Sequence, residues 1–271
     1  MHKCTFAQNQ DNPMAQYSLG LIYYCNTFNT FKTNEIKKGI QYIMLALKNG
    51  YKMAYFSYGF LLQEGKNIDR NIDEAIHYYK EASSFNNNYA KNNLGIIYKH
   101  GYGDKIKSNI VNSIVYFEEA IRQKKDFLSM YNLAHIYIFD ETIKKDINKS
   151  IDLLTKSAKF IHSFVLLSLL LVKMYEFNFE AVKVEISKRV DITNISHQVF
   201  KMINSFFSLS NQDFDNLFES YRSNDFVYDI QFNPVLYSDI KYRNKETAPL
   251  KNPKAKNISS EFYEAFGIEF L

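Results

Sequence analysis

The chain of 271 residues has no tryptophan and is poor in the residues that make turns and disulfides, with nine glycines, four prolines and two cysteines. So few glycines and prolines argue against an all-β sandwich, because that fold is rich in turns. The two cysteines, Cys4 and Cys25, are interpreted as reduced thiols, which indicates a reducing compartment.

Long apolar stretches are absent as well. The longest apolar run, Phe164–Val172, contains Ser168 and is far shorter than the ~20 residues of a membrane-spanning helix. Near the N-terminus, the polar run Gln8–Asn12 lies where a signal peptide needs an apolar core. We therefore expect a cytoplasmic protein.

The net charge of +4 is small and unevenly distributed. Residues 241–257 carry six basic side chains against the single acid Glu246, a charge of +5, so the rest of the chain sums to −1. The repeats described below therefore have no basic face, and no nucleic-acid partner is expected.

The sequence also has no arrangement of residues typical of a catalytic site. Its six histidines show no pairing four residues apart, and neither a phosphate-binding glycine loop nor a G-x-S-x-G motif occurs. We therefore expect no catalytic activity, no metal and no cofactor.

What the chain does contain is a recurring helical hairpin, clearest in Ala90–Ala120. Apolar or small residues recur at helical spacing from Ala90 to Tyr98, and again from Ser113 to Ala120. The segment Gly101–Gly103 lies between them. The pattern predicts two antiparallel helices joined by a glycine-rich turn.

The hairpin recurs with a period of 36 to 39 residues. The small residue that opens the first helix of successive repeats is Ala15, Ala54, Ala90 and Ser129. Five residues later, where the two helices must cross closely, come Gly20, Gly59, Gly95 and Ala134. In the second helix, small residues seven apart form the pairs Gly39/Ala46, Ala75/Ala82, Ser113/Ala120 and Ser150/Ser157. A fixed period in this range predicts a solenoid whose repeats cover one another.

The second helices have recognisable starts. Asn71, Asn109 and Asp146 each lie four residues before the first small residue of their helix, where an N-cap side chain accepts backbone N–H bonds. Asn71 and Glu74 also have the spacing of a capping box.

This pattern resembles the Sel1-like repeat, and Ala54–Ser83 and Ala90–Ala120 carry the resemblance best. The related tetratricopeptide repeat is the alternative, but its period is shorter, at about 34 residues, and it lacks a variable turn. Insertions between the helices, such as 26–33, favour the Sel1-like interpretation. The resemblance covers roughly residues 7–160.

The resemblance implies an all-α fold, a right-handed α-solenoid of helix-turn-helix repeats. The residues that follow the repeats predict a helical C-terminal cap and an irregular tail. The solenoid is expected over 1–190, with repeats at about 13–50, 51–86, 87–125 and 126–160 and a degenerate repeat at 161–190. Two more helices, at 196–209 and 213–222, are expected in a cap at 191–223. Residues 224–271 are expected to form the tail, with the basic linker and a short terminal helix.

In such solenoids the first helices line a concave face. Here the concave face is defined by four positions in each repeat, counted from its opening small residue: one residue before it, and two, six and nine residues after it. The position one residue before is Met14 in the first repeat and Met53 in the second. The candidate partner-binding residues on it are Tyr17, Leu21, Tyr24, Phe56, Phe60, Asn92, Lys99, Tyr131 and His135. Aromatic residues dominate its first half and anchor peptides well. The alternative is that these side chains pack on one another or on the C-terminal tail.

Sel1-like proteins are scaffolds, so the resemblance implies a non-catalytic adaptor for a protein or peptide of unknown identity. One alternative is a regulatory or self-associating fragment of a larger repeat assembly. Ala7 occupies the last small position of a second helix whose first turns are missing, so the N-terminal end could stack on another repeat chain. The other alternative is a membrane-peripheral protein that uses the basic segment 241–257 and the aromatic tail.

Overall fold

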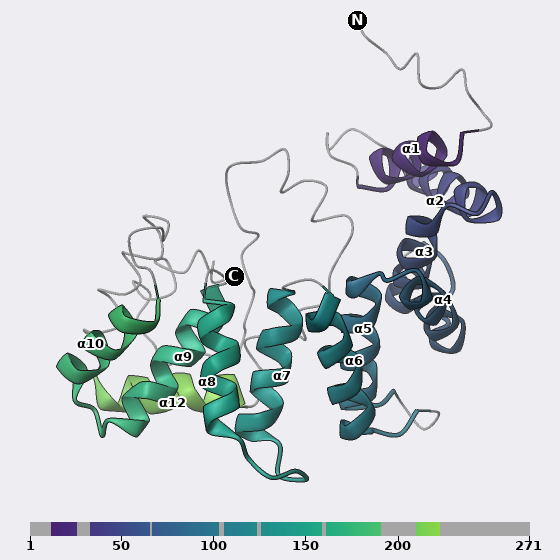
Figure 1. Cartoon of the computed structure of the whole chain (residues 1–271). Coiled ribbons are helices and arrows are strands. Elements are labelled where there is room, and N and C mark those ends of the chain that lie inside the picture. Colours follow the sequence, from purple (N-terminus) through teal and green to yellow (C-terminus); the bar gives the residue numbers. More distant parts are fainter. Residues whose placement is uncertain are drawn as a thin grey trace, which may run out of the picture. The chain divides into compact units, whose positions relative to one another are not determined.

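The computed structural model describes residues 12–25, 33–65, 67–102, 106–123, 126–158, 161–190 and 210–222. These ranges hold eleven α-helices, labelled as in Figure 1: α1 (Pro13–Cys25), α2 (Thr33–Lys48), α3 (Lys52–Glu64), α4 (Ile72–Ser84), α5 (Asn88–His100), α6 (Ile110–Gln123), α7 (Phe127–Phe139), α8 (Ile147–Lys156), α9 (Ile161–Met174), α10 (Phe179–Arg189) and α12 (Asn211–Arg222). Across these ranges, extended pairing is limited to one isolated bridge between Tyr102 and Ile106. The prediction of an all-α fold is confirmed.

The chain divides into two compact units, and helices α1–α6 belong to the first while α7–α12 belong to the second. In the first unit α1 packs on α2, α3 on α4 and α5 on α6, and successive pairs meet through α2–α3 and α4–α5. In the second unit α7 packs on α8 and α9 on α10, with α8 against α9 and α12 against α9. Sequential helix pairs of this kind are the solenoid that the repeats predict.

Several predicted features lie outside the described residues. They are the N-terminal Cys4 and Ala7, the first cap helix at 196–209, the basic segment 241–257 and the terminal helix of the tail. The predicted boundaries of the solenoid, cap and tail stay predictions.

The second helices begin at the predicted capping residues. Asn71 Oδ1 accepts the backbone N–H of Glu74 at 3.2 Å, and Asn71 Nδ2 donates to Glu74 Oε2 at 3.1 Å, which is the predicted reciprocal pair. Asn109 Oδ1 accepts from the N–H of Asn112 at 3.0 Å, and Asp146 Oδ1 accepts from the N–H of Lys149 at 2.9 Å. Each side chain satisfies a backbone donor that has no partner within its own helix.

The small residues lie where paired helices approach each other. A Cβ atom at Gly95 would lie 2.6 Å from Cε1 of Phe117, so only glycine leaves room for that ring. Ser113 Oγ also donates to the Gly95 carbonyl at 2.7 Å, which fixes the crossing of α5 and α6. The predicted repeat positions are all buried: Ala15, Gly20, Ala54, Gly59, Ala75, Ala82, Ala90, Gly95, Ala120 and Ala134.

A buried polar chain connects α3, α4 and α5. Tyr79 lies on α4 at the position that Phe117 occupies on α6, and its hydroxyl donates to Gln63 Oε1 at 2.7 Å. Asn93 Nδ2 donates to the same hydroxyl at 3.2 Å. Burial raises the pKa of Tyr79, against the smaller opposing effect of the Asn93 hydrogen bond, so the phenol stays protonated at neutral pH. The network ties the second repeat to the third.

The cap helix α12 begins slightly earlier than the sequence suggests. It was expected from Asp213 and starts at Asn211, because Ser210 supplies the N-cap. The backbone N–H of Asp213 donates to Ser210 Oγ at 3.2 Å, and the Ser210 hydroxyl donates to Asp213 Oδ2 at 2.7 Å.

Candidate functional site

The structure places the nine candidate residues of the concave face mostly inside the protein. Six of them are buried: Tyr17, Phe56, Phe60, Asn92, Tyr131 and His135. The other three are half-buried: Leu21, Tyr24 and Lys99. Whether any of them binds a partner stays a prediction.

In the first two repeats the aromatic candidates contact neighbouring repeats. The Tyr17 hydroxyl lies 2.8 Å from Ser57 Oγ, which links α1 to α3, and its ring centroid lies 5.1 Å from that of Tyr51. Phe56 packs between Tyr79 and Tyr89, with ring centroids at 5.8 and 6.1 Å. These side chains therefore contribute to the joints between repeats.

The residues that open the concave face are more accessible. Met14 is 50% exposed and Met53 is 38% exposed, and both lie one residue before the small residue of their repeat. The equivalent Tyr89 of the third repeat is half-buried and Leu128 of the fourth is buried. Within the described residues, the accessible apolar part of this face therefore lies on α1 and α3.

In the third repeat the candidates are polar. Asn92 is completely buried on α5, and its side-chain amide donates to Asn93 Oδ1 at 3.4 Å. That bond extends the polar network of Tyr79 by one residue. The Lys99 carbonyl accepts from Ser108 Oγ at 2.6 Å, which holds the turn that follows α5.

In the fourth repeat the concave face is covered by another part of the chain. His135 Nε2 lies 2.7 Å from the carbonyl oxygen of Tyr221, on α12. Phe139, one turn after His135, packs against Phe218 of α12 with the two rings tilted and their centroids 5.3 Å apart. The predicted alternative was packing on the C-terminal tail, whereas the contact comes from α12. The apolar spacing of Phe214, Leu217, Phe218 and Tyr221 indicates a helix face that needs a partner surface.

Groups with a shifted pKa occupy structural positions. Burial raises the pKa of the carboxyl of Asp126, against the hydrogen bonds that this N-cap accepts from Ser129 and Leu128. Burial likewise raises the pKa of Tyr58, Tyr78 and Tyr116, with a smaller contribution from nearby carboxylates or phenols. Among the described residues, no group of three or more His, Cys, Asp or Glu side chains is arranged to hold a metal ion.

None of the helices in the described part of the chain is both long enough and apolar enough to span a bilayer.

Comparison with known proteins is consistent with this geometry. A family model described as Sel1 repeat matches residues 13–50, 52–84, 88–125 and 128–159, just over half of the chain. Among solved structures, a Sel1 repeat protein from Oxalobacter formigenes matches with a TM-score of 0.54 and 16% identity, over 79% of this chain and 88% of that one.

A second solved structure is a protective antigen of uropathogenic Escherichia coli that displays an SLR fold. It matches at 18% identity with a TM-score of 0.38, over 79% of this chain, and the chain spans 53% of that protein. No curated protein sequence matches the chain. At these identities the structural likeness to the first protein concerns the fold alone.

Proposed function

The chain belongs to the Sel1 repeat family, and from this premise we propose that it is a non-catalytic adaptor that holds a peptide or protein partner on its concave face. The Sel1 solenoid is a protein-interaction scaffold fold, which supports a binding role and names no partner. The proposed compartment, the cytoplasm, rests on the sequence expectations alone.

The observation that carries the proposal is the pair of exposed methionines that open the concave face. Met14 and Met53 are repeat-equivalent, so they present the same kind of side chain at the same place on successive first helices, α1 and α3. The half-buried Leu21 and Tyr24 lie on the same helix as Met14. Exposed thioethers on such helices suit the binding of a protein segment, because methionine adapts to differently shaped partners.

The buried candidates are poor targets for testing this proposal. Phe56 is completely buried, so truncation to alanine would cost about 3–5 kcal/mol of stability and would impair any function through unfolding. Met53 is accessible, and a charge there would disturb an apolar contact with a partner while leaving the core intact.

The experiment is to select peptides from a display library on the immobilised full chain, and to measure their affinity for wild type, Met53→Glu and Val115→Glu. Val115 is 46% exposed on the second helix α6, so Val115→Glu is the matched control. We expect Met53→Glu to weaken binding at least about tenfold, as for a central interface anchor, and the control to change it less than twofold. Equal effects of the two substitutions, with both variants folded by circular dichroism, would contradict the proposal.

A second candidate function is self-association through the first repeat. Besides Met14, the apolar side chains Ile22 on α1 and Met44 and Leu45 on α2 are exposed. Sedimentation of the full chain across a concentration series tests this candidate: a dimer that Met44→Glu abolishes favours it, and a monomer at all concentrations excludes it. The membrane-peripheral alternative depends on the basic segment 241–257, which lies outside the described residues.

A further inference from the structure

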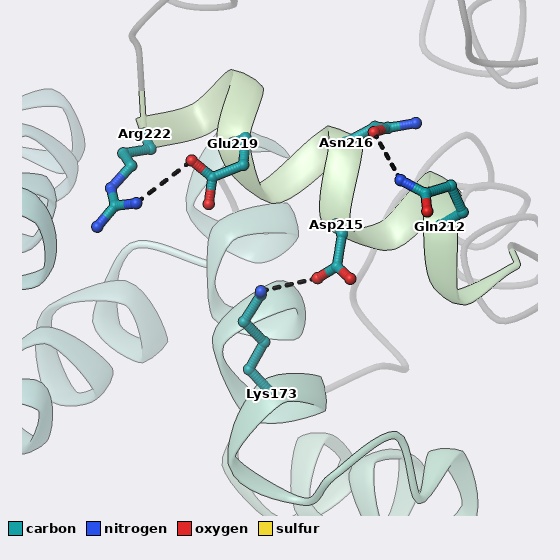
Figure 2. Close-up of polar contacts among 6 residues, drawn as sticks. All are labelled: Lys173, Gln212, Asp215, Asn216, Glu219 and Arg222. Carbon is teal, nitrogen blue, oxygen red and sulfur yellow. Dashed lines mark hydrogen bonds and ion pairs between the residues drawn. The ribbon is translucent and has the colours of Figure 1, made fainter.

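The cap helix α12 has two faces of different chemistry. Phe214, Leu217 and Tyr221 are buried almost completely, at the i, i+3 and i+7 spacing of one helix face. The other face carries pairs within the helix itself: Gln212 Nε2 donates to Asn216 Oδ1 at 3.2 Å, and Arg222 pairs with Glu219 at 3.4 Å (Figure 2). An amphipathic helix of this kind requires an apolar surface to lie on.

The surface under α12 is built from repeat-equivalent positions of two first helices. Phe139 of α7 and Lys173 of α9 each lie ten residues after the opening small residue, Ser129 or Ser163. Both contact Phe218: the Phe139 ring centroid is 5.3 Å from that of Phe218, and Lys173 Nζ lies 4.4 Å from the same centroid. The helix therefore lies across the C-terminal ends of α7 and α9.

An ion pair also links α12 to α9. Lys173 Nζ lies 2.8 Å from Asp215 Oδ1, and Figure 2 shows the lysine reaching from the end of α9 to the side of α12. Just beyond the same end of α9, the surface continues to the turn that leads into α10, because Phe214 packs on Phe177 and Phe179 with ring centroids at 6.2 and 5.5 Å.

His135 binds the C-terminal end of α12. The Tyr221 carbonyl belongs to the last turn of the helix, whose carbonyls lack a partner within the helix. A carbonyl oxygen only accepts, so His135 Nε2 carries the hydrogen and donates it at 2.7 Å. A helix ending is thus recognised by a side chain on a first helix, at one of the positions predicted to bind a partner.

These contacts have the form of helix-in-groove recognition, in which apolar anchors at i, i+3 and i+7 seat a helix and polar groups orient it. Alone, a helix of 12 residues is marginal in water, so α12 depends on this surface for its helical form. Helix and surface therefore behave as a ligand and its binding site joined in one chain.

We propose that the surface of α7 and α9 beneath α12 is a binding site for an acidic amphipathic helix, that α12 is its resident occupant, and that a partner helix of the same pattern must displace α12 to bind. The partner class is defined by the contacts: apolar residues at i, i+3, i+4 and i+7, an acid at i+1 facing Lys173, and a free helix end facing His135. The proposal goes beyond the adaptor function proposed above, because it concerns a second binding site, in the second unit.

The test uses the full chain and a fluorescent synthetic peptide of residues 208–224. Wild type is compared with Phe214→Ala/Leu217→Ala, which removes two buried anchors of the internal helix. We expect the variant to bind the peptide at least about tenfold more tightly, because affinity for an occupied site is reduced by the fraction of molecules in which the site is free. A folded variant that does not bind the peptide would overturn the proposal.

A charge swap makes the test specific to this surface. In the Phe214→Ala/Leu217→Ala chain, adding Lys173→Asp should weaken binding of the wild-type peptide about two- to fivefold, the usual effect of an exposed ion pair. A peptide carrying Asp215→Lys should bind the Lys173→Asp chain with the lost affinity restored. The same peptide should bind the chain that keeps Lys173 more weakly than the wild-type peptide does. Equal binding by all four combinations would place the peptide elsewhere and would refute the assignment.

Native-state hydrogen exchange of wild type gives an answer that needs no variant. We expect the amides of α12 to exchange at least about tenfold faster than those of α7 and α9, because a displaceable helix opens separately from its binding site. Exchange of α12, α7 and α9 as one cooperative unit would show that α12 is part of the core and would overturn the proposal. So would a dimer in which two chains exchange α12, since the occupant would then be a second copy.

This outcome is separable from that of the adaptor proposal. Peptides selected on wild type and weakened by Met53→Glu report on the first unit, whereas the residue 208–224 peptide and Lys173→Asp report on the second. A failure in one set of measurements leaves the result of the other interpretable.

Discussion

The close crossing of α5 and α6 offers a quantitative test of how the repeats are built. A Cβ atom at Gly95 would lie 2.6 Å from the completely buried ring of Phe117. At the equivalent positions of the fourth repeat the chain has Ala134 and Leu154, both completely buried. Glycine with phenylalanine and alanine with leucine are thus two ways to fill the same crossing. We predict that Gly95→Ala and Phe117→Leu compensate each other.

The magnitudes follow from the geometry. The extra methyl group of Gly95→Ala should cost about 1–3 kcal/mol through overpacking, offset by about 1 kcal/mol of helix propensity. Phe117→Leu alone should cost about 1 kcal/mol, because it leaves space beside Gly95. In the double variant the methyl group fills that space, so the combined loss should be about 1–2 kcal/mol smaller than the sum of the two separate losses.

Hydrogen exchange of the amides of α5 and α6 is the suitable assay, because repeat arrays need not unfold in a single cooperative step. The four chains of the double-mutant cycle give the coupling free energy directly. A control is Gly50→Ala, whose Cβ would meet nothing within 4 Å and whose cost comes only from its φ of 76°. Additivity of Gly95→Ala and Phe117→Leu within about 0.5 kcal/mol would refute the argument.

Three further changes test the polar elements of the fold. Asn71→Ala removes the N-cap of α4 and should destabilise the second repeat by about 1 kcal/mol, measured by exchange of the α4 amides; Asn71→Ser should recover most of this loss. Tyr17→Phe removes the buried hydroxyl that lies beside Ser57 Oγ and should lower the free energy of unfolding by about 1–2 kcal/mol, seen as a lower thermal midpoint. Adding Ser57→Ala to this variant should not lower the midpoint further. Burial raises the pKa of Tyr79 above its ordinary value near 10, so the unfolded chain ionises first as the pH rises and stability should fall above pH 10 by about 1.4 kcal/mol per pH unit for this group. Tyr79→Phe should make the alkaline loss of stability shallower; an unchanged slope would contradict the burial argument.

The sequence alone determined the local architecture. Small residues at fixed spacing predict helices that cross closely, and Asn71, Asn109 and Asp146 predict where second helices begin, because capping and periodicity depend on residues three or four apart. The assignment of a concave face to the first helices came from the resemblance to Sel1-like solenoids and stays a prediction.

The accessibility of that face was decided by tertiary structure. Phe56 is an aromatic residue of the kind that anchors peptides, yet it is completely buried between Tyr79 and Tyr89, which belong to other helices. His135 lies at a predicted binding position, yet it donates to Tyr221, 86 residues away in the sequence. No local sequence pattern predicts such a pairing, because the two residues meet only when α12 packs against α7 and α9. Which side chains are left for a partner is therefore a property of the folded chain, while the repeat that presents them is a property of the sequence.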